Sequence, residues 1–337
     1  MWNMLTKINK NLVTAIPAMM LLGFAFGAAA EAATVKQLKV LILPFTFLMV
    51  YPMMVNLNIK NLAKSARNFN LQLMTQFINF ALIPFLAYGL GLYFFPDRPY
   101  MALGLLLASL LPTSGMTISW TGFAKGNMEA AVNMTVIGLI LGSLAAPFYI
   151  QLLMGTRVEI NLALVIKQIF IIVFLPMFLG YVTRRTLLKR YTMTEFKNRL
   201  APRFPALSTI GVLGIVFVAL ALKARTIMQD PAILASIFMP LLIIYSVNFV
   251  IGTFAGRLFF SRGDGIALVY GTVMRNLSIA LAIAINAFGA QGANAALVIA
   301  VAYIIQVQSA AWYVKFTDRI FGPALPANST ELQRSST

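Results

Sequence analysis

The chain contains no cysteine and no histidine, and only 9 of its 337 residues are acidic. Without these side chains there is no disulfide, no thiolate nucleophile and no histidine-based metal site or proton relay. An acid–base or metal-dependent active site also needs carboxylates, and none falls at the centre of an apolar segment. We therefore expect a protein that is not an enzyme, with no metal site and no cofactor.

Charged residues are scarce as well: they make up 10% of the chain, whereas 60% of the residues are hydrophobic. A soluble domain normally carries about 25% charged residues. The apolar residues gather in runs of about 20, the length at which a helix crosses roughly 30 Å of hydrocarbon. Since backbone groups in lipid must bond internally and these runs are continuous, we predict an all-α polytopic protein of the inner (plasma) membrane.

Ten transmembrane spans can be placed, in two sets of five, and the longest polar connection, from Arg184 to Pro205, lies between spans six and seven. The predicted spans are 12–30, 38–57, 70–95, 101–122, 129–152, 160–182, 206–222, 232–260, 265–287 and 293–316. The first repeat covers residues 1–155, the second covers 156–320, and 321–337 form a polar tail. Because five is an odd number, the second repeat is inverted relative to the first, as in many secondary transporters.

The net charge of +17 comes from 26 basic and 9 acidic residues. The basic residues lie between the apolar runs, so we expect them to orient the protein in the bilayer rather than bind nucleic acid. The larger share lies on the side of the two termini, which we therefore place in the cytoplasm. That side includes Lys7, Lys10, Lys60, Lys64, Arg67, Arg334 and the basic connection between spans six and seven.

Two spans, the fourth of each repeat, are interrupted by polar residues. Pro112 breaks span four, because proline cannot donate a backbone hydrogen bond, and Arg275 falls inside span nine. A broken helix presents helix ends and freed carbonyls to a solute, so we predict that the two breaks cross near the membrane midplane. The predicted solute-binding residues are Thr113, Ser114, Thr117, Arg275, Asn276 and Ser278, with Asn133 and Gln306 as secondary candidates. The alternative for Pro112 is an ordinary proline kink.

Arg275 lies near the middle of its span, about 15 Å of helix from either membrane surface. Arginine stays protonated, so a charge is held inside the membrane at a cost of several kcal/mol. Freed helix carbonyls, water or an anionic solute could satisfy it, and the alternative is a structural arginine bonded to the break at Pro112. The absence of intramembrane carboxylates argues against a strongly cation-coupled mechanism, although sodium or proton coupling stays open.

Three segments resemble a known group of transporters: Tyr51-Pro52-Met53, the run from Trp120 to Asn127, and the run from Asn276 to Ala284. They are similar to the arsenical-resistance permeases, which belong with the bile acid:sodium symporters in one superfamily. The resemblance covers the whole chain in the number and order of spans. It implies a panel of spans one, two, six and seven, a core of spans three to five and eight to ten, and a solute between two parts that rock for alternating access.

The chain departs from this group at four positions. Arsenite permeases have a cysteine where Thr113 lies here and a glutamate where Ser278 lies. Sodium-coupled bile acid carriers place a glutamate near Gly271 and a glutamine near Arg275. The resemblance therefore implies that a fixed arginine takes the place of a sodium ligand and could substitute for the ion itself.

The most direct interpretation is a secondary transporter that moves a small oxyacid or anion, arsenite-like, by alternating access. The main alternative is an organic-anion transporter of the bile-acid type. A channel and a membrane enzyme are further alternatives from other functional classes. The expected partners are a small solute and the lipid bilayer, without nucleic acid.

Overall fold

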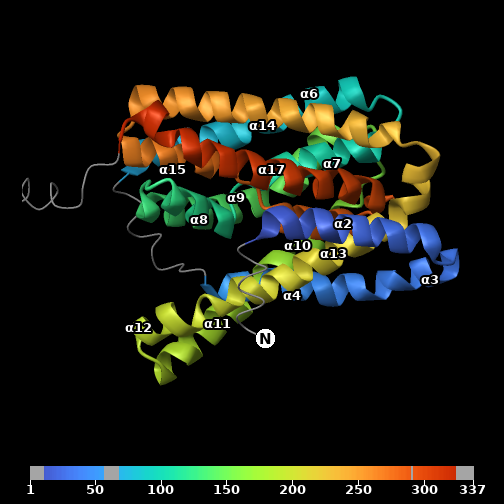
Figure 1. Ribbon diagram of the computed structural model, residues 1–337, viewed down its shortest axis with the longest axis horizontal. Helices are drawn as coiled ribbons and strands as arrows, with labels where there is room; N and C mark the ends of the chain where they lie inside the picture. Colours follow the sequence, from blue (N-terminus) through green and yellow to red (C-terminus); the bar gives the residue numbers. More distant parts are fainter. Residues whose placement is uncertain (1–10, 57–67, 290, 324–337) are drawn as a thin grey trace, which may run out of the picture.

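The computed structural model describes residues 11–56, 68–289 and 291–323, and this part of the chain is helical almost throughout (Figure 1). The first half contains α2 (Leu12–Ala29), α3 (Ala32–Gln37), η1 (Leu38–Leu41), α4 (Ile42–Asn56), α5 (Phe69–Gln76), η3 (Phe77–Leu82), α6 (Ile83–Phe94), α7 (Pro99–Leu110), α8 (Gly115–Phe123) and α9 (Met128–Met154). The second half contains α10 (Leu162–Ile169), η4 (Phe170–Phe174), α11 (Leu175–Arg190), α12 (Met193–Glu195), η5 (Phe196–Leu200), α13 (Arg203–Gln229), α14 (Ala232–Phe259), α15 (Arg262–Val273), α16 (Leu277–Ala287) and α17 (Gly292–Phe321).

Within the described residues, 7 helices are long and apolar enough to cross a membrane. These are Ala32–Asn56, Phe69–Phe94, Met128–Met154, Leu162–Arg190, Met193–Gln229, Ala232–Phe259 and Gly292–Phe321. The all-α, multi-pass membrane protein predicted from the sequence is therefore confirmed.

Helices also occupy each of the ten predicted ranges, but not all of them as single long helices. Spans four and nine are each split into two short helices, and the first span is a shorter apolar helix, Thr14–Ala29. The full count of ten membrane crossings therefore stays a prediction. So does the orientation, since Lys7, Lys10, Lys60, Lys64, Arg67 and Arg334 lie outside the described residues.

Polar side chains fix where several helices begin. The side chain of Asn127 accepts a hydrogen bond from the backbone N–H of Ala130 at 3.0 Å and so caps α9. Asn161 does the same for α10, with the N–H of Leu164 at 3.0 Å. Such caps satisfy backbone donors that the first turn of a helix cannot pair internally. Asn127 and Asn161 thus fix where α9 and α10 begin.

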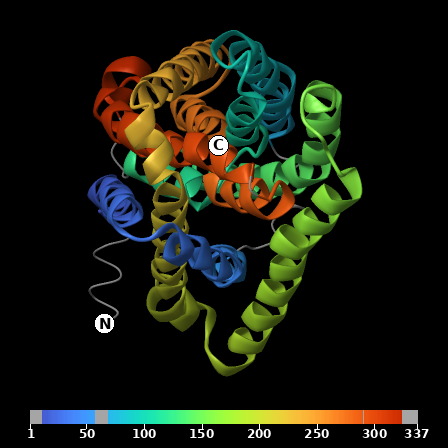
Figure 2. The ribbon, with the colours of Figure 1, turned by 90° about the vertical axis from the view of Figure 1, so that its right-hand side faces the viewer.

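Two groups of helices pack mainly within themselves (Figures 1 and 2). In the first group, α13 packs against α2 and α4, and α11 packs against α4. In the second group, α14 packs on α15, α17 on α7 and α16, and α6 on α7. The two groups meet where α16 contacts α4 and α10, and where α17 contacts α2 and α13. These contacts place the short helix α16 at the boundary between the groups.

The two breaks predicted from the sequence meet in space. Pro112 and Arg275 form an antiparallel bridge between the extended segments that follow α7 and α15. The backbone N–H of Thr113 donates to the carbonyl of Met274 at 2.7 Å, and the N–H of Asn276 donates to the carbonyl of Leu111 at 2.8 Å. Each break therefore provides hydrogen-bond partners for backbone N–H and carbonyl groups of the other break. The predicted meeting of the two breaks is confirmed. We call residues 111–114 and 274–276 together the crossing.

Thr113 adopts a left-handed backbone conformation at the crossing, with φ at +63°. For a β-branched residue this conformation costs on the order of 1–3 kcal/mol and persists only when the surroundings enforce it. Its hydroxyl donates to the carbonyl of Pro112 at 2.6 Å and also faces the carbonyl of Thr135 on α9 at 3.3 Å. Gly138 of α9 allows this approach, because a Cβ there would meet the Thr113 hydroxyl.

Candidate functional site

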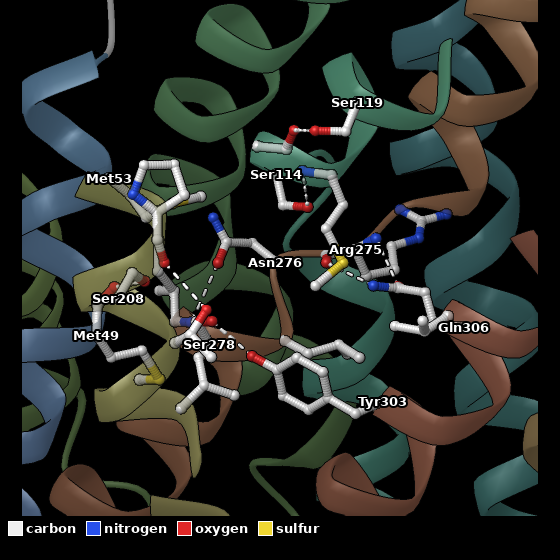
Figure 3. Close-up of a pocket in the computed structure, with 18 of the residues that line it drawn as sticks. Met49, Met53, Ser114, Ser119, Ser208, Arg275, Asn276, Ser278, Tyr303 and Gln306 are labelled. Carbon is white, nitrogen blue, oxygen red and sulfur yellow. Dashed lines mark hydrogen bonds between the residues drawn. The ribbon is translucent and has the colours of Figure 1, made fainter. Parts of the chain in front are cut away.

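A cavity of about 500 Å³ lies beside the crossing (Figure 3). One wall comes from α4 and α13, and the other comes from α8, the crossing, α16 and α17. The cavity therefore lies between the two groups of helices. A volume of this size falls within the range of roughly 300–1,000 Å³ that small-molecule sites occupy.

Two helices begin at this cavity, and both begin with a capped N-terminus. Ser114 precedes α8, and its hydroxyl accepts a hydrogen bond from the N–H of Met116 at 3.2 Å. Asn276 precedes α16, and its amide oxygen accepts from the N–H of Ile279 at 3.2 Å. Both capping residues line the cavity. Since a helix N-terminus carries a partial positive charge of about half an elementary unit, the two ends favour an anion or an electronegative oxygen between them.

Apart from Arg275, the polar side chains of the wall are neutral. Figure 3 shows the carboxamide of Asn276 extending from the crossing toward the side where Met53 and Ser208 lie. The hydroxyls of Ser278 and Tyr303 are hydrogen-bonded to each other, which joins α16 to α17. No aspartate or glutamate lines the cavity in the described part of the chain. The site therefore offers hydrogen-bonding groups and positive potential without a competing negative charge.

The remaining wall is apolar and rich in methionine. Met49, Met53 and Met54 of α4 lie on one side, and Met116 and Trp120 of α8 lie on the other. Methionine side chains are flexible and polarisable, so they adapt to solutes of different shape. The chain contains no cysteine, so these walls hold thioethers and no thiol. A solute with an apolar portion as well as a polar end would fit this lining.

Arg275 contributes to the lining, but Figure 3 shows its guanidinium turned away from Met53 and Ser208. The residue is only 2% exposed, and Nε, Nη1 and Nη2 have no hydrogen-bond partner among the described residues. The absence of a carboxylate partner, expected from the sequence, thus holds for the described part of the chain. Contact between the guanidinium and a solute stays a prediction, since it requires another side-chain conformation.

Two buried asparagines flank the end of α15 next to Arg275. Asn79 donates to the carbonyl of Gly271 at 3.0 Å, and Asn248 donates to the carbonyl of Thr272 at 2.8 Å. Both amide oxygens have no hydrogen-bond partner among the described residues. Arg275 also follows the C-terminal end of α15 by two residues, where the helix dipole favours a cation. The end of α15 therefore supplies negative potential near Arg275, and neither asparagine oxygen is hydrogen-bonded to the guanidinium.

Gln306 of α17 binds the crossing instead of pointing freely into the cavity. Its amide oxygen accepts from the backbone N–H of Arg275 at 2.8 Å, and its amide nitrogen donates to the Arg275 carbonyl at 3.2 Å. The hydroxyl of Tyr245 donates to the same amide oxygen at 3.0 Å. Gln306 lines the cavity, yet both ends of its amide are already used.

Three predicted site residues are not part of the cavity lining. Thr113 is fully buried and holds the break, as described above. Thr117 is also buried, and its hydroxyl accepts from the N–H of Ser114 at 3.1 Å, which completes the cap of α8. Asn133 lies on α9 with 6% exposure, and its amide oxygen has no partner among the described residues. Thr113 and Thr117 therefore hold the backbone of the crossing and the start of α8, whereas Asn133 lies outside the lining.

Sequence reasoning missed most of the opposite wall. Met49 and Ser208 come from helices with no polar break, so nothing in their local sequence distinguishes them from packing residues. Met53 belongs to the segment Tyr51-Pro52-Met53 that carried the resemblance, but sequence reasoning assigned it no role in the site. The hydroxyl of Ser208 donates to the carbonyl of Met49 and ties α13 to α4. Tyr303 lies three residues before Gln306 and so on the same face of α17. That spacing alone could have identified Tyr303.

A model of the sodium bile acid symporter family matches residues 43–230, which is more than half of the chain. The chain belongs to this family. The resemblance to the superfamily drawn from the sequence is thus confirmed. Since the family consists of membrane transporters, the chain is a transporter of this superfamily.

Curated relatives come from both branches of the superfamily. The arsenical-resistance protein Acr3 of Corynebacterium glutamicum is 22% identical over 259 residues, covering 73% of this chain and 70% of that protein. Acr3 of Alkaliphilus metalliredigens is 22% identical over 298 residues, covering 84% and 82%. Sodium/bile acid cotransporter 7 of Xenopus tropicalis is 21% identical over 196 residues, covering 55% and 54%. Identity this low does not carry a solute from any of them to this chain.

Proposed function

We propose that this chain is a secondary transporter that carries a small oxyacid or anion, arsenite-like, by alternating access. The observation that supports this most is the meeting of two capped helix N-termini, at Ser114 and Asn276, in a cavity whose described lining holds no acid. In this proposal the oxygens of the solute accept hydrogen bonds near the starts of α8 and α16. Ser278 adds a hydroxyl at the same wall.

The proposed architecture has ten spans in two inverted repeats, residues 1–155 and 156–320. The panel consists of α2, α3–α4, α10–α11 and α13, and the core consists of α5–α9 and α14–α17. Both termini lie in the cytoplasm, on the side of the plasma (inner) membrane with the larger share of basic residues. Alternating access then consists of movement of the core against the panel, during which the contacts of α16 with α4 and α10 must change.

We further propose that transport does not require sodium. Arg275 places a permanent positive charge two residues beyond the end of α15, and Asn79 and Asn248, which bond the last turn of α15, hold amide oxygens without a hydrogen-bond partner among the described residues. Such oxygens are the kind of group that would coordinate a monovalent cation. In this proposal the guanidinium of Arg275 provides the positive charge that a bound cation would otherwise provide. It also adds to the positive potential that an anionic solute meets at the crossing.

A bile-acid-type organic anion is the second candidate solute, and the size of the cavity favours it. Arsenous acid has four heavy atoms, whereas the cavity measures about 500 Å³ and has methionine, valine and tryptophan in its walls. Pockets lined in this way bind the apolar portion of an organic molecule while a few polar groups fix its head. The two candidate solutes therefore differ in the size of their apolar portion, whereas both present oxygen atoms to the two helix N-termini.

A thermal-shift screen of the purified protein distinguishes the candidates. The probes are arsenite, antimonite and small carboxylates, each with either NaCl or KCl. Since a ligand that binds only the folded state raises the melting temperature, we expect stabilisation by one probe class to the same extent in both salts. A lipid-facing control, Met239→Ala, should respond like the wild type, because Met239 is 54% exposed. Absence of stabilisation by every probe would contradict the proposal.

A further inference from the structure

Met53 of α4 lies directly against Gly115, the first residue of α8. Its terminal methyl group fills the space that a side chain at position 115 would occupy. This contact crosses from the panel to the core, and both residues line the cavity. The tip of Met53 therefore occupies the end of the cavity at the N-terminus of α8, beside Ser114.

The lining as a whole is unusually rich in methionine. The chain has 18 methionines in 337 residues, whereas Met49, Met53, Met54 and Met116 are four of the 22 lining residues. This share is about three times the average of the chain, and it gives the wall side chains that change shape easily. Among the four, Met53 is the one whose tip rests on Gly115, the residue that directly follows the crossing. Because Gly115 has no side chain, the tip of Met53 has space beside it and is not held by a side chain at position 115.

We propose that Met53 is a displaceable plug that sets the size of the solute which the cavity accepts. This inference rests on the proposed function, because the space that the methyl group fills is where the head group of the solute would bind. The unbranched thioether changes rotamer at little cost, so the plug withdraws when a solute oxygen reaches the start of α8. The class of solute is a carboxylate or oxyacid whose body fits the space that Met53 then leaves.

The contact between Met53 and Gly115 provides a reciprocal test. In Gly115→Ala, the new methyl group pushes the tip of Met53 into the cavity, and we expect affinity for carboxylates to fall about tenfold. In Met53→Ala, the plug is absent, and we expect the preference to move toward longer carboxylates. The double variant should bind within about threefold of the wild type, since each change removes the partner of the other.

The probes are the straight-chain monocarboxylates from acetate to octanoate, together with arsenite. Affinity is read from the melting temperature and from the fluorescence of Trp120, which lines the cavity. A further variant, Met53→Ile, keeps an apolar side chain of similar size but makes it stiff at χ1. We expect it to lower affinity for every probe while keeping the melting temperature of the ligand-free protein. It therefore tests the plug even if Gly115→Ala folds poorly.

The outcomes separate this inference from the function on which it rests. If the wild type binds no probe, the proposed function fails and the plug fails with it. If the wild type binds but Met53→Ala and Gly115→Ala act additively, only the plug is overturned. The same holds if Met53→Ile binds like the wild type. The lipid-facing Met239→Ala should match the wild type in every measurement.

Discussion

The side-chain amide of Gln306 pairs with both backbone groups of Arg275, accepting from its N–H at 2.8 Å and donating to its carbonyl at 3.2 Å. On the other side of the same segment, the break at Pro112 supplies a second set of backbone hydrogen bonds. The crossing is therefore bonded from two directions. This arrangement lets an extended segment persist inside the membrane, where unpaired backbone groups are costly.

Replacement of Gln306 by leucine should destabilise the protein. The change leaves the buried N–H and carbonyl of Arg275 without side-chain partners, at a cost of about 1–3 kcal/mol. The measurement is the free energy of unfolding, or the melting temperature, of the purified variant. Gln37→Leu at the exposed end of α3 is the matched control and should have little effect. Equal stability of the two variants would show that the crossing does not depend on Gln306.

Solute binding by the wild type should be the same in sodium and in potassium, because Arg275 already supplies the cation. Arg275→Gln removes the charge and keeps a polar, although shorter, side chain. We expect its solute affinity to fall in potassium and to recover in part when sodium is added. Titration of both proteins in the two salts measures this. A wild type that binds only in sodium would exclude the built-in cation.

Conservative and drastic changes at Arg275 distinguish a solute role from a structural one. If its charge and fork of donors act on the solute, Arg275→Lys should weaken binding and Arg275→Ala should abolish it, with the fold kept. If Arg275 is an internal brace, both variants should lose stability while the remaining folded protein binds normally. Melting temperature and affinity, measured on the same two samples, separate these cases.

Gly138→Ala tests whether the break in span four depends on its close approach to α9. A Cβ at this position would meet the hydroxyl of Thr113, so overpacking should lower stability by about 1–3 kcal/mol. Gly89→Ala in α6 is the matched control, because a Cβ there meets nothing within 4 Å. We expect the control to be neutral or to stabilise the protein by up to about 1 kcal/mol. A neutral Gly138→Ala would contradict the contact.

The positions of the helices and of the two breaks could be predicted from the sequence, because hydrocarbon thickness fixes the length of apolar runs. Pro112 and Arg275 interrupt such runs, which made their meeting predictable. The roles of Thr113 and Thr117 could not be predicted, because their hydroxyls form local hydrogen bonds that hold the break and cap α8. The direction of the Arg275 guanidinium also depends on packing between distant helices.

The wall formed by α4 and α13 lay beyond prediction for a related reason. Met49 and Ser208 differ from other residues of their helices only by what they face, and this is set by tertiary packing. Periodicity cannot separate a face toward a cavity from a face toward lipid or toward another helix when all three are apolar. Polar breaks are therefore visible in such a sequence, whereas apolar cavity walls are not.

The most direct test of the account is solute uptake by proteoliposomes that contain the wild type, Asn276→Leu or the control Met239→Ala. Labelled arsenite and a labelled small carboxylate are offered in turn, with sodium or potassium outside. We predict that the wild type and the control take up one of the two solutes equally well in both salts, and that Asn276→Leu does not. Uptake by Asn276→Leu at the wild-type rate, or no uptake of either solute by the wild type, would contradict solute binding at the crossing.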